Sequence, residues 1–163
     1  MVLVTINYRL GQFGYFAHPA LTKGAGADEP LANYGTMDQI AALKWVRDNI
    51  AAFGGDPGNV TVFGESAGGV ATLLMLTVPD ARGLYQKAIV ESGGGWSRMK
   101  GLSAAEADGV ATAKAAGLGD DATADQLRAL PADKIGASTA GLGFGPVIDG
   151  RLVKESIPSA FAN

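Results

Sequence analysis

The stretch Val60-Thr-Val-Phe-Gly-Glu-Ser-Ala-Gly-Gly69 decides how the rest of the chain is interpreted. Residues 60–63 are apolar or β-branched and predict a short strand. The apolar segment Val70-Ala-Thr-Leu-Leu-Met-Leu76 follows at once and predicts a helix. The residues between them, Gly64-Glu-Ser-Ala-Gly68, are therefore expected to form a sharp turn from a strand into a helix.

This turn matches Gly-x-Ser-x-Gly, the nucleophile elbow, a motif that is meaningful only between a strand and a helix. A strained turn of this kind lifts the hydroxyl of Ser66 clear of its neighbours, so Ser66 is the candidate nucleophile. Gly64 and Gly68 lack Cβ atoms, which lets the strand and the helix pass close to the turn. The N–H of Ala67 is the candidate oxyanion-hole donor. The alternative is a merely flexible glycine-rich turn.

Length and composition favour one globular domain. The chain has 163 residues, and its 24 glycines cluster at the expected element boundaries, with no repeat and no linker. Its net charge of −3 offers no broad attraction to nucleic acid or anionic membranes. It has no cysteine, hence no disulfides or thiolate metal sites, and no apolar run approaches the ~20 residues that span a bilayer. A basic-then-apolar leader is not visible, and the residues leave the cellular location open.

The order of the expected elements predicts an α/β fold. Val2-Leu-Val-Thr-Ile-Asn-Tyr8 is apolar on both faces, as in a buried strand of a parallel sheet, and residues 9–32 read as an extended loop. Apolar residues at helical spacing predict a helix over 36–53, capped by Thr36 or Asn33 and ended by Gly54-Gly55. With the elbow this gives strand, helix, strand, turn and helix, which implies a mainly parallel sheet with flanking helices.

A further strand is predicted at Lys87-Ala-Ile-Val-Glu91, and it ends at Ser92. Parallel sheets place their chemistry at the carboxyl ends of the strands, where both Ser66 and Ser92 fall. Ser92 is therefore either a turn serine or a residue that supports the site.

Later segments carry less chemistry. A helix is expected over 103–117, with a capping box formed by Ser103 and Glu106, and a second over 123–130, stopped by Pro131. Residues 143–150 read as an extended segment that closes in a turn at Asp149.

Several stretches together resemble one family. They are Val4-Thr-Ile-Asn-Tyr-Arg-Leu-Gly11, Asn33-Tyr-Gly-Thr-Met-Asp-Gln39, Ala42-Leu-Lys-Trp-Val-Arg-Asp-Asn-Ile50, Phe53-Gly-Gly-Asp-Pro57 and the elbow itself, with Ala88-Ile-Val-Glu-Ser-Gly93 and Gly145-Pro-Val-Ile-Asp-Gly150 further on. The chain is similar to the type B carboxylesterases, which include cholinesterases and para-nitrobenzyl esterases. The block from residue 33 to 69 is the most specific part of the resemblance.

The resemblance implies an α/β-hydrolase fold and two-step hydrolysis of a small carboxylic ester through an acyl-enzyme, without a metal or organic cofactor. Ser66 matches the family's nucleophile and Ala67 its oxyanion donor. Glu65 matches the acidic residue before the serine. Ser92 matches a serine that supports the acidic member of the triad by hydrogen bonding.

The chain also departs from the family's pattern. Family members are much longer, with a glycine-rich oxyanion loop upstream of the first strand and the triad acid and histidine downstream of residues 145–150. We therefore expect residues 1–163 to form a single partial domain, an internal segment that lacks both regions. Such a segment is expected to show little or no activity alone and to self-associate through uncovered surfaces. The sole histidine, His18, fits a structural loop residue, and Asp149 is a poor candidate for the acid.

Two other functions compete with this interpretation. The scaffold also occurs in non-catalytic binding and adhesion proteins such as the neuroligins, but these lose the serine nucleophile, which is kept here as Ser66. A compact single-domain esterase that uses His18 as its base is the other alternative.

Overall fold

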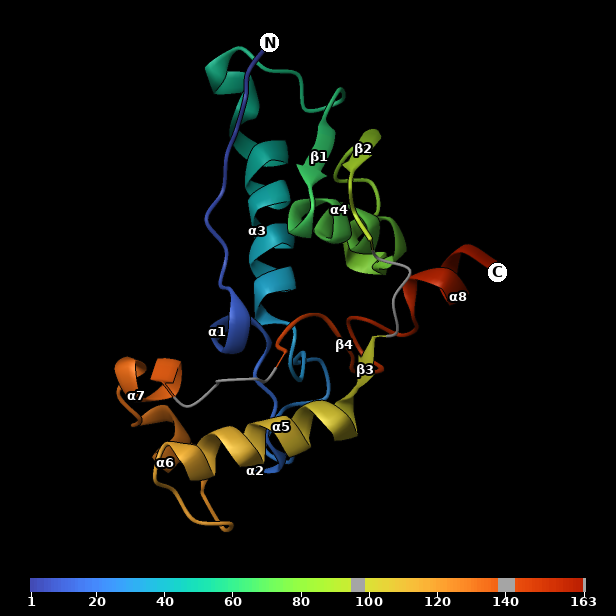
Figure 1. Ribbon diagram of the computed structural model, residues 1–163. Coiled ribbons are helices and arrows are strands. Elements are labelled where there is room, and N and C mark those ends of the chain that lie inside the picture. The colour runs from blue at the N-terminus through green and yellow to red at the C-terminus, as the bar shows by residue number, and fades with distance from the viewer. Residues whose placement is uncertain (95–98, 138–142, 163) are drawn as a thin grey trace. The chain divides into compact units, whose positions relative to one another are not determined.

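The structure is a computed structural model that describes residues 1–94, 99–137 and 143–162 (Figure 1). The chain divides into two compact units. The first comprises residues 1–8, 36–98 and 152–163, and the second comprises residues 9–35 and 99–151.

The first unit contains the parallel strand pair predicted around the elbow. Its described elements are α3 (Tyr34–Asn49), the 3₁₀ helix η1 (Ile50–Phe53), β1 (Thr61–Glu65), α4 (Ala67–Thr77), the 3₁₀ helix η2 (Pro79–Ala81), β2 (Lys87–Glu91) and α8 (Ile157–Ala162). Of α3, residues 36–49 belong to this unit. β1 and β2 pair in parallel, in a register that runs from Thr61 opposite Lys87 to Glu65 opposite Glu91. The expected order of strand, turn, helix and parallel strand is confirmed.

The helix α3 ends at Asn49, earlier than predicted, and the 3₁₀ helix η1 continues to Phe53, where Gly54 stops it as the sequence predicts. Gly54 takes a left-handed conformation, with φ of 78°, and its N–H donates to the carbonyls of Ala51 and Ile50. Asp56 then closes a turn by accepting from the N–H of Gly58 at 2.8 Å. The helix begins at Tyr34, so Thr36 lies inside it and the prediction of Thr36 as the cap is wrong.

Helix α4 covers one face of the strand pair. It packs against both β1 and β2, and also against α8, and its residues Leu73, Leu74 and Met75 are buried. The opposite face of the pair is open: Phe63 and Ile89 stand opposite each other in the register and remain 56% and 51% exposed. This is an uncovered apolar surface of the kind expected from the sequence, and self-association through it stays a prediction.

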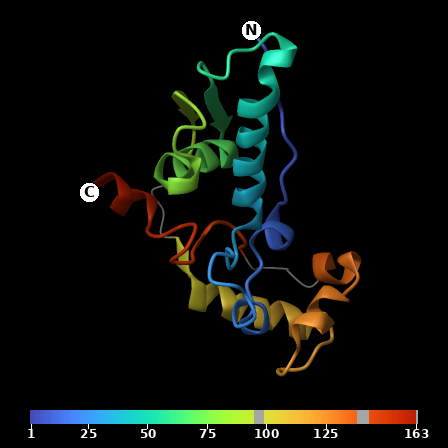
Figure 2. The ribbon, with the colours of Figure 1, turned by 180° about the vertical axis from the view of Figure 1, so that it is seen from behind.

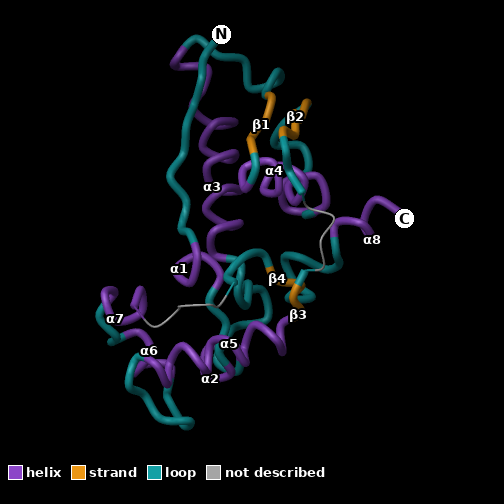
Figure 3. The backbone as a smooth tube through the Cα atoms, in the orientation of Figure 1, coloured by secondary structure: helices purple, strands orange, loops and turns teal. Residues whose placement is uncertain are grey.

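Residues 2–8 do not form the predicted buried strand. They are extended, without strand pairing, and residues 1–7 are exposed. In Figures 1 and 2 the segment runs alongside α3, and Figure 3 draws it as loop. An extended segment becomes a strand only when a neighbouring strand satisfies its backbone N–H and C=O groups. Within the described part of the first unit no strand pairs with it, so β-propensity alone does not make it one.

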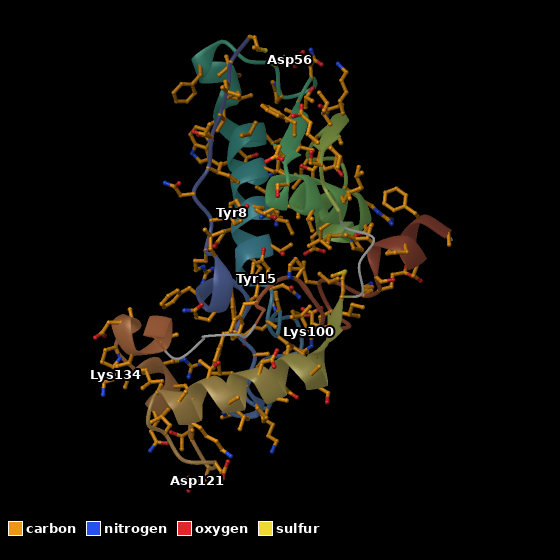
Figure 4. All side chains as sticks on the ribbon, viewed as in Figure 1. Tyr8, Tyr15, Asp56, Lys100, Asp121 and Lys134 are labelled. Atoms are coloured by element: carbon orange, nitrogen blue, oxygen red, sulfur yellow. The ribbon has the colours of Figure 1, made fainter. Side chains whose placement is uncertain are left out.

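The second unit is mainly helical. Its described elements are α1 (Gly11–Tyr15), α2 (Pro19–Thr22), β3 (Lys100–Gly101), α5 (Leu102–Ala115), α6 (Ala124–Arg128), α7 (Ala132–Ala137) and β4 (Val147–Ile148), with β3 and β4 paired in parallel. Figure 4 labels Tyr15 on α1, Lys100 on β3, Asp121 in the loop between α5 and α6, and Lys134 on α7. Two short helices therefore interrupt residues 9–32, so the prediction of an extended loop is wrong at α1 and α2.

One hydrogen-bonded cluster joins distant parts of the second unit. The amide of Asn33 donates to the carbonyl of Val147 and to Asp149, and its oxygen accepts from the N–H of Val147, each at 2.9 Å. The other carboxylate oxygen of Asp149 accepts from the N–H of Arg151. Because Asn33 and Asp149 are buried, these bonds replace water that the groups lose on folding. The cluster shows that Asp149 has a structural position in its turn.

Two helix N-termini differ from prediction: α5 lacks the capping box that was predicted, and α6 has one that was not. α5 begins at Leu102 after Gly101, without a side-chain cap, and Glu106 instead accepts from the hydroxyl of Thr22, so the predicted capping box at Ser103 is wrong. α6 has a complete capping box, formed by Thr123 and Gln126. The spacing of a hydroxyl and an acid or amide predicts a box only when no distant partner takes the N3 side chain.

His18 caps α2 and is 3% exposed. Its Nδ1 accepts the N–H of Ala20 at 3.1 Å, which requires the neutral imidazole. Burial lowers the pKa of His18, and the nearby Glu106 opposes this only in part.

The stability of the chain should therefore fall in mild acid. The unfolded chain, with a histidine pKa of about 6.5, binds a proton there more readily than the folded chain does, so folded stability is lost as the pH drops through that value. Urea unfolding followed by circular dichroism between pH 7.5 and 5.5 measures this loss. His18→Asn keeps a capping oxygen but does not titrate, so its stability should fall less over the same range. Identical pH profiles for the two proteins would contradict this explanation.

Candidate functional site

Ser66 lies in a strained backbone conformation between β1 and α4. Its φ is 53° and its ψ is −113°, values that residues with a Cβ rarely adopt. The side chain is exposed, and its hydroxyl makes no capping bond to α4. Within the described part of the first unit no hydrogen bond of that hydroxyl is formed. The geometry is that of a serine held at an exposed strand-to-helix corner.

Backbone hydrogen bonds hold this corner from both sides. The N–H of Ser66 donates to the carbonyl of Glu91 at 2.9 Å, which ties the turn to the end of β2. The carbonyl of Ser66 accepts from the N–H of Val70 at 3.0 Å, which is the first hydrogen bond of α4. The serine is thus fixed by the neighbouring strand and by its own helix.

Close backbone approach requires glycine at two positions around the corner. A Cβ on Gly64 would lie 2.4 Å from the carbonyl carbon of Gly68. A Cβ on Gly69 would lie 2.6 Å from the carbonyl oxygen of Glu91 and 2.7 Å from the Cα of Gly93. These distances leave no room for a side-chain carbon, so β1, α4 and the end of β2 pass each other at backbone contact.

The structure refines the predicted roles of the glycines. A Cβ on Gly68 would meet nothing within 4 Å, so Gly68 matters because its backbone approaches Gly64, not because its own side chain must be absent. Gly69 and Gly93, which the sequence analysis did not single out, are the pair that lets α4 approach β2. The glycine doublet at 68–69 and the glycine run after Ser92 were the available signals.

The other candidate residues surround Ser66. Ala67 is the first residue of α4, and the first N–H groups of a helix have no acceptor within it. Glu65 ends β1 with its side chain exposed, opposite Glu91 in the register. Ser92 follows β2 directly and also has a positive φ, 50°. Two strained serines therefore follow two paired strands, at the carboxyl end of the pair.

The chemistry that this corner offers is that of a nucleophile next to an anion-stabilising helix end. The partial positive charge of the helix N-terminus and its unpaired N–H groups favour negative charge that develops beside Ser66. In residues 1–94, 99–137 and 143–162 no three His, Cys, Asp or Glu side chains gather to hold a metal ion. No helix in those ranges has the length and apolar composition to cross a bilayer.

Comparison with known proteins then places the chain. A sequence model of the carboxylesterase family matches residues 1–163, the whole chain. The chain belongs to the carboxylesterase family. The resemblance to type B carboxylesterases seen in the sequence is thereby confirmed.

Relatives and solved structures agree with this family. The chain is 42% identical over 176 aligned residues to the para-nitrobenzyl esterase of Bacillus subtilis, covering 99% of this chain and 34% of that protein. It is 40% identical to the fumonisin B1 esterase of Sphingopyxis macrogoltabida, and the alignment covers 99% of this chain and 30% of that protein. A crystal structure of a Geobacillus stearothermophilus carboxylesterase superposes with a TM-score of 0.84 at 36% identity, over 94% of this chain and 34% of that one.

These comparisons establish the fold class and the relative length. The strand pair β1–β2 with α4 is part of an α/β-hydrolase fold, as the sequence predicts. The chain spans about a third of the length of the esterases it matches.

Alanine substitutions at adjacent glycines test the backbone contact. Gly69→Ala should destabilise the chain by about 1–3 kcal/mol, because its Cβ meets backbone atoms of residues 91 and 93 that cannot turn aside. Gly68→Ala is the matched control. It should be neutral, or up to ~1 kcal/mol more stable, because alanine favours the helix and meets no atom. Urea unfolding of the two variants measures the difference, and equal stabilities would refute the proposed contact.

Glycine at position 66 should relieve the strain of the corner. The values φ 53° and ψ −113° lie in the mirror image of the β region, which glycine populates freely. We expect Ser66→Gly to be about 1 kcal/mol more stable than Ser66→Ala. Glycine relieves a backbone strain of roughly 1–3 kcal/mol, but the larger conformational entropy of glycine in the unfolded chain offsets part of that gain. Ser103, inside α5, is the control position: there glycine should be about 1 kcal/mol less stable than alanine. The same sign at both positions in thermal unfolding would contradict the strain.

Proposed function

We propose that this chain carries the nucleophile of a serine carboxylic-ester hydrolase and that the nucleophile is Ser66. The observation that carries the proposal is the backbone of Ser66, strained and exposed at the carboxyl end of β1 and at the start of α4. Strain of this kind costs folding energy, and it concentrates at active sites, where it positions a reacting group. Membership of the carboxylesterase family supports the ester as substrate class.

The proposed reaction has two steps. The Ser66 oxygen bonds to the ester carbonyl carbon while a histidine base takes its proton, and the carbonyl oxygen becomes an oxyanion. The N–H of Ala67, at the N-terminus of α4, stabilises that oxyanion. The bond to the alcohol then breaks, and the alcohol leaves with the proton. Water, activated by the same base, next attacks the acyl-enzyme and releases the acid together with free Ser66.

Within this chain the base is the missing group. His18 is committed to capping α2 through Nδ1, and its pKa is lowered by burial. We propose that the base, its orienting acid and the second oxyanion donor come from segments outside these 163 residues, as the resemblance implies. Glu65 and Ser92 are proposed to support the site, with Ser92 at the end of the neighbouring strand. The 163 residues alone are then expected to have negligible activity, since a serine without a base is a weak nucleophile.

A chimera provides the decisive test. The 163 residues replace the matching third of the Bacillus subtilis para-nitrobenzyl esterase, and the hybrid is assayed with p-nitrophenyl butyrate. We expect repeated turnover that Ser66→Ala lowers by at least about a thousandfold, as for the loss of a catalytic nucleophile. Ser103→Ala, on an exposed part of α5, should leave the rate unchanged.

The isolated chain, assayed beside its own Ser66→Ala variant, should give two rates that are equal and near background. A folded chimera whose turnover is indifferent to Ser66→Ala would refute the nucleophile, whereas a folded chimera without turnover would favour a non-catalytic binding role for the scaffold. Turnover by the isolated chain that depends on Ser66 would instead refute the external base.

A further inference from the structure

The second unit contains a cavity that the proposed esterase chemistry does not use. Its volume is about 360 Å³, and it is lined from α1, α2, α5, α6 and α7 together with Tyr34. This volume lies at the low end of the ~300–1,000 Å³ found for small-molecule sites. All of its described lining residues belong to the unit that lacks Ser66.

Most of the cavity wall is apolar. Phe13, Phe16, Leu21, Leu127, Leu130 and Ile135 are among the residues that line it. Phe16, Leu21 and Leu130 also pack against the small core of the unit, around Leu127, so this wall is anchored. A wall of this kind accepts a hydrocarbon chain or ring and gains free energy from the apolar area that leaves water.

The charged part of the wall is entirely cationic. Arg9 and Arg128 line the cavity, and no aspartate or glutamate is among the described lining residues. The Arg9 guanidinium lies 5.5 Å from the centre of the Tyr34 ring. Burial raises the pKa of Tyr34, and the positive charges of Arg128 and Arg9 oppose that rise. Arg9, Arg128 and Tyr34 all line this one cavity.

The carboxylate beside Arg128 is a weak competitor for a ligand, whereas Arg9 already donates to the backbone carbonyl of Tyr34 at 3.5 Å. Asp125 lies 3.8 Å from Arg128, and both side chains are largely exposed, so this contact exchanges readily with water. The negative charge of Glu29 contributes to the raised pKa of Tyr34, but Glu29 is not among the described residues that line the cavity. Guanidinium groups pair with carboxylates through two parallel hydrogen bonds, and a phenol hydroxyl adds a third donor.

We propose that this cavity binds a small amphipathic carboxylate, with the carboxylate at Arg128 and Tyr34 and the hydrocarbon against the apolar wall. A neutral ligand of the same length would offer Arg128 no carboxylate to pair with. A short anion would leave the apolar wall in contact with water. The inference is independent of the proposed ester hydrolysis.

Octanoate, octan-1-ol and acetate, titrated into the 163-residue chain by calorimetry, test the proposal. Octanoate should bind, octan-1-ol at least about tenfold more weakly (~1.4 kcal/mol), and acetate without detectable heat. Arg128→Gln should weaken octanoate roughly tenfold and leave octan-1-ol unchanged. Arg128 is chosen because Arg9 also stacks on Tyr34. Arg82→Gln, which removes an exposed arginine of the first unit, is the matched control and should bind as the parent chain does.

A second variant tests the proposal by filling the cavity. Leu130→Trp places a larger side chain in the cavity and should abolish octanoate binding, with folding checked by circular dichroism. Absence of octanoate binding, equal affinity for octanoate and octan-1-ol, or binding that survives both Arg128→Gln and Leu130→Trp would each overturn the proposal.

Discussion

Backbone contact among β1, α4 and β2 is the constraint on which the first unit depends. Gly64 lets the start of α4 lie against β1, and Gly69 lets α4 lie against the end of β2. The hydrogen bond from Ser66 to the carbonyl of Glu91 exists because the two strands run parallel in a register that ends at residues 65 and 91. A side chain at either glycine would push the helix away from the sheet and loosen the turn between them.

In the second unit a single buried amide has a comparable effect. Asn33 bonds to both backbone groups of Val147 and to Asp149, across 114 or more residues of sequence. An amide side chain has a donor and an acceptor side by side, so it pairs with an extended strand much as another strand would. This explains two of the sequence stretches that carried the family resemblance: residues 33–39 and 145–150 both contribute to one hydrogen-bonded cluster.

The sequence predicted what short-range physics determines. β1, β2, α3 and α4 follow from apolar periodicity and from turn residues such as Gly54 and Asp56. Prediction from the sequence failed where a residue distant in the sequence determines the local structure. Residues 2–8 have the composition of a strand but no strand paired with them in the described part of their unit, and Glu106 bonds to Thr22 instead of closing a box with Ser103. At the candidate site, the motif predicted the sharp strand-to-helix turn at Ser66 but not the close approach at Gly69. Its role depends on how closely α4 approaches β2, and that distance is not expressed in a five-residue pattern.

The strain at Ser66 also bears on how the proposed nucleophile is positioned. In the described part of the first unit, the hydrogen bonds and close approaches that fix the corner run from Gly64 through Val70 to the residues that end β2, within about thirty residues of sequence. Backbone strain of roughly 1–3 kcal/mol persists only where the surroundings over-determine it. Here those surroundings are local. These contacts hold the backbone of Ser66 in place, whereas the proposed mechanism also requires a base that takes its proton. Under the proposed mechanism, positioning and activation of the nucleophile are separable properties of the polypeptide, and a chain that provides only the first is expected to fold around Ser66 and to show no catalysis.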